Sequence, residues 1–189
     1  MTVLEMMPTG MDLDIVVDHR QDLAGGTAAA VFDESRTYRY LLTRIWDPAR
    51  APMVWVMLNP STADAFVEDA TVRRLAGGNG FARREGAGGI VVVNLFAVRS
   101  TDPRVLLRHE DPVGRYNDVF IRQATSMSST VVCAWGAAGV QHGRGQQVTE
   151  ALTARRVALS CLGTTSTGQP RHPLYVPGDA VLQPYGGVS

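Results

Sequence analysis

Four runs of mostly apolar residues divide the chain, and each of them ends in a polar or glycine-containing turn. The runs are short, rich in β-branched and aromatic residues, and lack alternation of apolar and polar positions, a pattern typical of strands buried on both faces. We therefore predict four buried strands, at Met53 to Leu58, Ile90 to Phe96, Thr130 to Trp135 and Val157 to Leu162.

Segments with apolar residues at helical spacing separate these strands. The pattern predicts helices over Val72–Arg84, Asn117–Met127 and Gln146–Arg156, and a short one over Pro103–Arg108. Glycines between positions 77 and 80 should break or bend the first helix. Because strands alternate with helices, the expected fold class is α/β, a three-layer α/β/α arrangement around a central, mostly parallel four-stranded sheet.

The region before the first buried strand has a different character. The first 11 residues show neither pattern, and we expect a loose tail there. Residues 28–46 hold two apolar or aromatic stretches around the turn-rich Asp33-Glu34-Ser35-Arg36, which favours an antiparallel hairpin on the sheet edge or across one end of it. We expect one domain over residues 1–189, with this hairpin beside an α/β core over residues 53–185.

Composition adds limits on location and partners. At 189 residues, 45% hydrophobic and 19% charged, the chain has the composition of an ordinary globular domain. Its formal net charge is zero, so binding to duplex nucleic acid would need a local basic patch. No apolar run approaches the ~20 residues that span a bilayer, and the N-terminus lacks the basic region of a signal peptide. These features predict a cytoplasmic protein without membrane contact, and no obligate protein partner is evident.

The turn after the first buried strand is the first candidate for chemistry. It reads Asn59-Pro60-Ser61-Thr62 and carries an amide and two hydroxyls, with no Lys or Arg before Arg73. The carboxyl ends of parallel strands meet at one edge of a sheet, so this turn should gather there with the loops at 99–102 and 163–175. Such a loop suits a neutral polar ligand or a water molecule, although turn and helix-cap chemistry would explain the same residues.

Three short motifs occur at the ends of the predicted strands and in the last loop. These are Met57-Leu58-Asn59-Pro60-Ser61, Trp135-Gly136 and His172-Pro173, and together they resemble motifs of the uracil-DNA glycosylase superfamily. The resemblance implies a three-layer α/β fold with a four-stranded sheet. It implies that Asn59 holds the attacking water, that Pro60 shapes the backbone, and that His172 donates to the departing base. It implies no metal or organic cofactor.

Longer motifs resemble a second family more closely. The chain contains LNPSTAD at Leu58–Asp64, VVNLFA at Val92–Ala97, AWG at Ala134–Gly136 and GQPRHPLY at Gly168–Tyr175. These runs are similar to the family called DUF1643, and the similarity covers roughly Tyr38 to Tyr185. That family supplies no activity, so a functional expectation has to come from the wider superfamily.

Carboxylates and arginines near these motifs are further candidates. Asp64 and Asp69 are candidate catalytic carboxylates, although Asp69, two residues before Thr71, also suits the N-cap of the following helix. Arg74 could reach a phosphate from that helix or lie on the surface. Arg99 follows the second buried strand and is the first choice for a phosphate or carboxylate contact.

Amide and aromatic side chains complete the candidate site. Asn94 lies inside a buried strand, where its amide either orients the Asn59 loop or bonds to neighbouring backbone. Trp135 ends the third buried strand and either packs in the core or stacks on a base, whereas Tyr175, in a polar loop, is the better stacking candidate. Ser61 and Thr62 are expected to bind the ligand beside Asn59.

These observations lead to one functional hypothesis and two alternatives. We expect a protein that recognises a nucleobase in DNA, RNA or a free nucleotide and hydrolyses its N-glycosidic bond. Met57 and Ser61 stand where the superfamily has glycine, which argues against duplex uracil repair in particular. The alternatives are a non-catalytic nucleotide or nucleic-acid binding module, and a metal-dependent phosphate hydrolase that uses Asp64 or Asp69.

Overall fold

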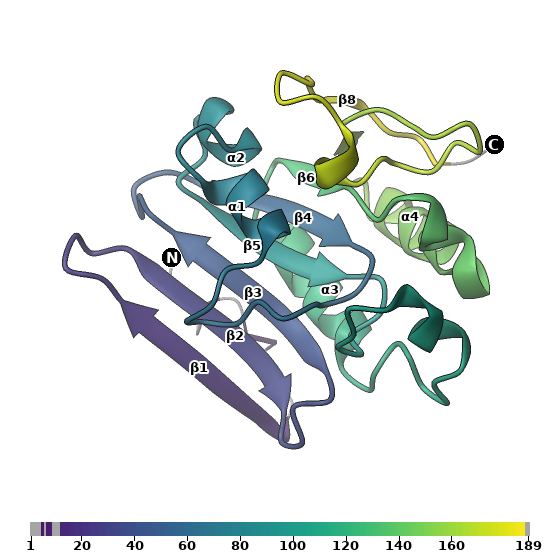
Figure 1. Ribbon diagram of the computed structural model, residues 1–189, viewed down its shortest axis with the longest axis horizontal. Coiled ribbons are helices and arrows are strands. Elements are labelled where there is room, and N and C mark those ends of the chain that lie inside the picture. Colours follow the sequence, from purple (N-terminus) through teal and green to yellow (C-terminus); the bar gives the residue numbers. More distant parts are fainter. Residues whose placement is uncertain (1–4, 6, 9–11, 188–189) are drawn as a thin grey trace.

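The computed structural model describes residues 5, 7–8 and 12–187, and most of the tail expected at residues 1–11 lies outside them. The described residues form one eight-stranded sheet in the order β1-β2-β3-β5-β4-β6-β7-β8 (Figure 1). The strands are β1 Ile15–Gln21, β2 Thr27–Asp33, β3 Arg39–Ile45, β4 Met53–Met57, β5 Gly89–Asn94, β6 Val131–Cys133, β7 Leu159–Cys161 and β8 Gln183–Pro184.

The four predicted buried strands are β4, β5, β6 and β7, and they form the parallel part of the sheet. β4 lies between β5 and β6, with Met57 opposite Asn94 and Val56 opposite Cys133. β6 also pairs in parallel with β7. The α/β class is therefore confirmed, and the carboxyl ends of these four strands lie at one edge as the sequence predicted.

The sheet is larger than the four strands expected from the sequence and from the resemblance to the glycosylase superfamily. The predicted hairpin is present as antiparallel β2 and β3, but it is not at an edge, because β3 pairs with β5 and β1 lies outside β2. β8 adds an antiparallel strand beside β7. A strand pattern does not specify its partner, since pairing joins residues far apart in the chain.

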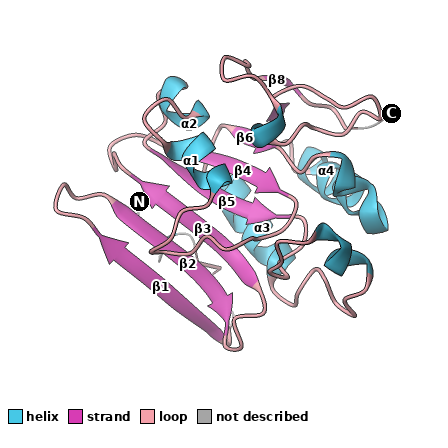
Figure 2. Ribbon diagram, viewed as in Figure 1, coloured by secondary structure: helices cyan, strands magenta, loops and turns pink. Residues whose placement is uncertain are grey.

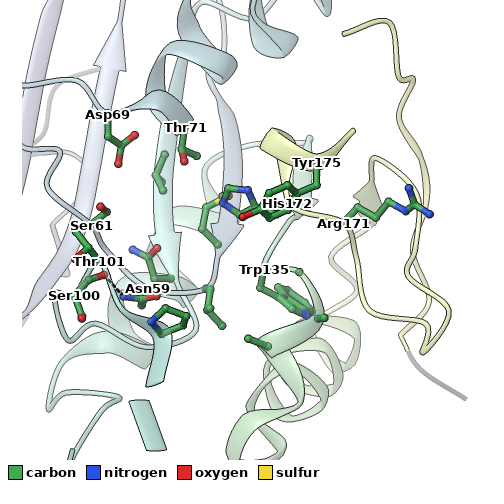
Figure 3. A pocket seen from close by; sticks show the side chains of 18 of the residues that line it. Asn59, Ser61, Asp69, Thr71, Ser100, Thr101, Trp135, Arg171, His172 and Tyr175 are labelled. Carbon is green, nitrogen blue, oxygen red and sulfur yellow. Dashed lines mark hydrogen bonds between the residues drawn. The ribbon is translucent and has the colours of Figure 1, made fainter. Parts of the chain in front are cut away.

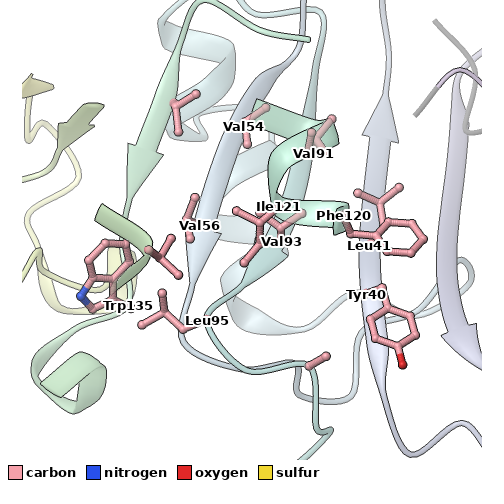
Figure 4. Close-up of a cluster of buried hydrophobic side chains, with 14 of the residues drawn as sticks. Tyr40, Leu41, Val54, Val56, Val91, Val93, Leu95, Phe120, Ile121 and Trp135 are labelled. Carbon is pink, nitrogen blue, oxygen red and sulfur yellow. The ribbon is translucent and has the colours of Figure 1, made fainter. Parts of the chain in front are cut away.

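Helices cover both faces of the sheet (Figure 2). Two hydrophobic clusters fill the space between the layers, and β4 contributes to both because its side chains alternate. The helices are α1 Ala70–Ala76, α2 Phe81–Arg84, α3 Asn117–Ser126 and α4 Arg144–Ala154. Val54 and Val56 pack toward α3 and α4, in the cluster shown in Figure 4. Trp55 packs toward α1 and α2 on the other face.

Local signals set the ends of several helices as predicted. Asp69 caps α1, because its carboxylate accepts a hydrogen bond from the Val72 backbone nitrogen at 2.8 Å. The expected break between α1 and α2 includes Gly80, where a Cβ atom would lie 2.4 Å from the Leu75 carbonyl oxygen. The short helix expected at Pro103–Arg108 is a 3-10 helix, η2, over Pro103–Leu107. None of the described helices is long and apolar enough to cross a membrane.

Candidate functional site

A pocket of about 690 Å³ opens at the carboxyl ends of the parallel strands. The loops after β4 and β5, the start of α1 and the loop that leads into the 3-10 helix η4, Pro173–Tyr175, form its walls (Figure 3). Leu42, Val92 and Leu75 contribute to its lining, which is mostly apolar by area, and polar side chains from several loops complete it. An apolar cavity with a few placed polar groups is the usual form of a site for a small organic ligand.

Asn59 joins two of these loops. Its Nδ2 donates to the carbonyl oxygens of Pro60 and Ser100, at 3.1 and 2.8 Å. The Ser100 backbone nitrogen in turn donates to the Pro60 carbonyl oxygen at 2.9 Å. With Nδ2 used in this way and no described residue donating to Oδ1, the amide can offer that oxygen to a water molecule or ligand.

His172 enters the pocket from the opposite wall. Its Nδ1 accepts a hydrogen bond from the Leu174 backbone nitrogen at 3.3 Å, so the neutral ring carries its proton on Nε2. Burial lowers the pKa of His172, and the negative charge of Asp69 opposes this effect without reversing it. The imidazole is therefore neutral near pH 7 and offers one N–H donor. Figure 3 shows the ring extending from its loop toward the wall that carries Asp69 and Thr71.

Asn94 ends β5 and lines the same pocket. It is 1% exposed, and its Nδ2 is buried without a hydrogen-bond partner among the described residues. Asn117 of α3 holds the strand end in place, because its own Nδ2 donates to the carbonyl oxygens of Asn94 and Leu95, both at 3.0 Å. A buried amide that lacks a partner costs free energy, so its retention beside a pocket points to a ligand that completes it.

Asn94→Leu is expected to raise the free energy of unfolding by about 1 kcal/mol and to weaken ligand binding, because an apolar group of similar size replaces an unsatisfied amide. Asn117→Leu is the matched control and should lower the same free energy by about 1–3 kcal/mol, since it removes one donor from each of the Asn94 and Leu95 carbonyl groups, of which Leu95 keeps its hydrogen bond from Arg144 Nε. Urea unfolding measures both. A large loss of stability in Asn94→Leu would show that this amide is already satisfied in the free protein.

The two candidate carboxylates occupy different places. Asp69 lines the pocket while one of its oxygens caps α1. Asp64 does not line it, and its Oδ1 accepts hydrogen bonds from the backbone nitrogens of Phe66 and Val67, at 2.7 and 2.8 Å. Asp64 therefore closes a local turn, and Asp69 is the carboxylate that the fold brings to Asn59 and His172.

Some of the remaining loop and aromatic candidates face the pocket and others do not. Ser61 lines the pocket, whereas Thr62 is exposed and is not among the lining residues. Tyr175 is 79% exposed at the rim, and its ring centroid lies 5.5 Å from that of His172. Trp135 also borders the pocket, but its Nε1 donates to Gln169 at 2.8 Å within the core. Tyr175 is thus the ring with a free face for stacking.

Neither predicted arginine reaches the pocket. Arg74 donates to the carbonyl oxygens of Pro173 and Val176, at 3.4 and 2.8 Å, and so holds the loop after His172 against α1. Arg99 donates to the Arg36 carbonyl oxygen, and its guanidinium lies 5.0 Å from the centre of the Phe32 ring. Arg74 thus supports one wall of the site, Arg99 packs against the hairpin, and neither side chain lines the pocket.

Several lining residues were not singled out as candidates from the sequence. Thr101 and Arg171 belong to loops that the sequence placed at this edge, and Thr71 lies at a helix start, but polar residues are ordinary at such positions. Arg39 belongs to the hairpin, and only the pairing of β3 with β5 brings it to this edge. Within the described part of the chain, no group of three or more His, Cys, Asp or Glu side chains is arranged to hold a metal ion.

The fold and the pocket define an α/β protein with a ligand pocket at the carboxyl ends of its parallel strands. The chain belongs to the DUF1643 family, described as proteins of unknown function, whose model matches residues 39–174. This match confirms the closer of the two resemblances; the one to the glycosylase superfamily rests on the motifs alone.

Comparison with other proteins adds little. None of the curated proteins matches the chain in sequence. Among solved structures, a mutant of the feruloyl esterase module from Clostridium thermocellum in complex with sinapinate is similar at 11% identity and a TM-score of 0.26. The similarity covers 71% of this chain and 49% of that chain, so the matched part is about half of the esterase chain. A similarity this weak carries no argument about fold or activity.

Proposed function

We propose that this protein recognises a nucleobase and hydrolyses the N-glycosidic bond that joins it to a sugar. The observation that carries the proposal is the meeting, in one largely apolar pocket, of Asn59, Asn94 and a neutral His172. A flat heterocycle fits an apolar cavity of this size, and its polar edge needs a few fixed donors and acceptors. The motifs shared with the uracil-DNA glycosylase superfamily support the same reading.

Each of the three residues has a distinct part in the proposed reaction. Asn94 hydrogen-bonds to the edge of the base, which gives its buried amide a partner. The Asn59 Oδ1 holds the water whose oxygen bonds to the anomeric carbon as the bond to the base nitrogen breaks. The bonding electrons leave with the base, and the Nε2–H group of His172 donates to the carbonyl oxygen on which the negative charge develops.

The remaining groups complete the balance of the reaction. The carboxylate of Asp69 stabilises the positive charge that develops on the sugar, which is oxocarbenium-like in such a transition state. Water supplies a hydroxyl group to the sugar and a proton to the base. The step needs neither a metal ion nor an organic cofactor. It needs a positioned water and electrostatic stabilisation of the departing base, which preorganised hydrogen-bond donors supply.

A base-release screen in chelator-containing buffer tests the proposal. The substrates are single- and double-stranded oligonucleotides with uracil, hypoxanthine, xanthine or alkylated bases, together with the matching free nucleotides. Chromatography follows free base, and Asn59→Ala purified in the same way excludes a contaminating enzyme. We expect release of one base by the wild-type protein and release at least about 100-fold slower by the variant. Thermal stabilisation by a nucleotide without any release would replace this proposal with a non-catalytic binding module.

A further inference from the structure

Arg39 is a charged residue of the pocket that the proposed reaction does not use. It opens β3, and its backbone nitrogen donates to the Ala97 carbonyl oxygen at 2.9 Å. Because β3 runs antiparallel to β5, the start of β3 lies at the same edge as the end of β5. The side chain is 3% exposed and lines the pocket beside Asn94 and Asp69.

The guanidinium group of Arg39 lacks a close counter-ion. No described carboxylate lies within 4.0 Å of it, its Nε is buried without a partner, and its Nη1 donates to the Ala63 carbonyl oxygen. Arg44, on the same strand and nearly as buried, differs because its Nε lies 3.6 Å from the Glu68 carboxylate. An arginine has five N–H donors, so Arg39 keeps most of its hydrogen-bonding capacity for something else.

The charge of Arg39 persists at neutral pH. Burial lowers its pKa to about 10, which leaves the group protonated at pH 7. More distant charges act on its pKa in both directions, because Asp69 and Asp64 favour the charged form while Arg99 and Arg44 disfavour it. A buried cation without a partner is costly, and a guanidinium is best satisfied by two oxygens of a planar or tetrahedral anion.

We infer that Arg39 binds a phosphate group of the ligand, so that the protein acts on a free nucleotide and not on a nucleoside. This inference rests on the proposed function, because it names the substrate class of the same pocket. A cavity of about 690 Å³ is large enough to enclose a mononucleotide. Arg39 is almost completely buried. A terminal phosphate can therefore contact it at the end of the pocket, whereas a phosphodiester would need space there for the rest of the nucleic-acid chain.

Calorimetry with nucleoside 5′-monophosphates and the matching nucleosides tests this inference. The wild-type protein should bind the nucleotide about 10- to 100-fold more tightly, the range expected for charge-assisted hydrogen bonds. In Arg39→Gln this preference should fall to about threefold or less, with nucleoside affinity unchanged. Arg39→Lys should retain part of the preference, since lysine keeps the positive charge but lacks the paired N–H donors of the guanidinium group. Arg44→Gln is the matched control from the same strand and should keep all of it.

Two further measurements separate this inference from the proposed function. Inorganic phosphate should raise the melting temperature of the wild-type protein but not that of Arg39→Gln. This result does not depend on whether the protein releases a base. Base release from nucleosides and nucleotides at equal rates and affinities would overturn the role of Arg39 and leave the glycosidase proposal intact. Arg39-dependent nucleotide binding without base release would support Arg39 and overturn catalysis. If Arg39→Gln does not fold, equal wild-type affinities for nucleotide and nucleoside still overturn the inference.

Discussion

Asn59→Ala and His172→Ala are each expected to lower turnover about 10²- to 10³-fold and to leave ligand affinity within about threefold. Both side chains act on groups that form or gain charge in the transition state, the attacking water and the departing base. Interactions made only in the transition state change kcat and leave ground-state binding nearly intact. Steady-state kinetics and calorimetry on the base found by the release screen measure the two quantities.

Conservative variants separate the chemical roles from structural ones. Asn59→Asp keeps an oxygen for water but replaces the Nδ2 donor with a second oxygen facing the Ser100 carbonyl, so it should also loosen the two loops. His172→Gln keeps an amide donor and should recover part of the activity that His172→Ala loses. Equal losses of affinity and turnover in the alanine variants would show that these residues only shape the pocket.

The pH profile gives an independent check on His172. Its pKa lies below the ordinary value of 6.5 because burial disfavours the charged ring. The neutral donor is therefore retained as the pH falls through 6.5, and turnover should stay level there until the lower folded pKa is reached. Loss of activity centred at or above 6.5 would contradict a buried neutral imidazole.

Trp55→Ala is expected to lower the free energy of unfolding by about 3–5 kcal/mol, the cost typical of emptying a large buried site. Trp55 lies at the centre of β4, has no exposed surface, and packs with its ring centroid 6.3 Å from that of Phe81 in α2. The cavity would lie beside β4, the strand that leads into the turn with Asn59. Urea unfolding followed by circular dichroism measures the effect.

Trp55→Phe is the matched variant for the same position. It leaves a smaller cavity and removes an indole N–H that is buried without a described hydrogen-bond partner, so it should cost clearly less than the alanine variant. A cost below about 1 kcal/mol for Trp55→Ala would show that α1 and α2 collapse onto β4 and that the core is less rigid than its burial indicates.

Local sequence signals were sufficient to predict those features of the fold whose physical cause lies within a few neighbouring residues. The apolar runs that became β4, β5, β6 and β7 are readable because a strand buried on both faces tolerates few polar residues. The cap at Asp69 and the break at Gly80 follow from the backbone of the same few residues. The position of the pocket also follows, because parallel strands gather their polar turns at one edge.

Contacts between segments that are far apart in the chain could not be predicted from local sequence signals. Nothing near Arg39 in the sequence indicates that β3 will pair with β5 and place a buried cation beside Asn94. Arg74 and Arg99 carry the side chain suited to phosphate, yet the fold directs them to the carbonyl oxygens of Pro173, Val176 and Arg36. The sequence by itself determined the four buried strands, their polar ends and the candidate pair Asn59 and His172. Only the tertiary structure decided which charges enter the pocket, because strand pairing and long side-chain contacts depend on residues that are far apart in the chain.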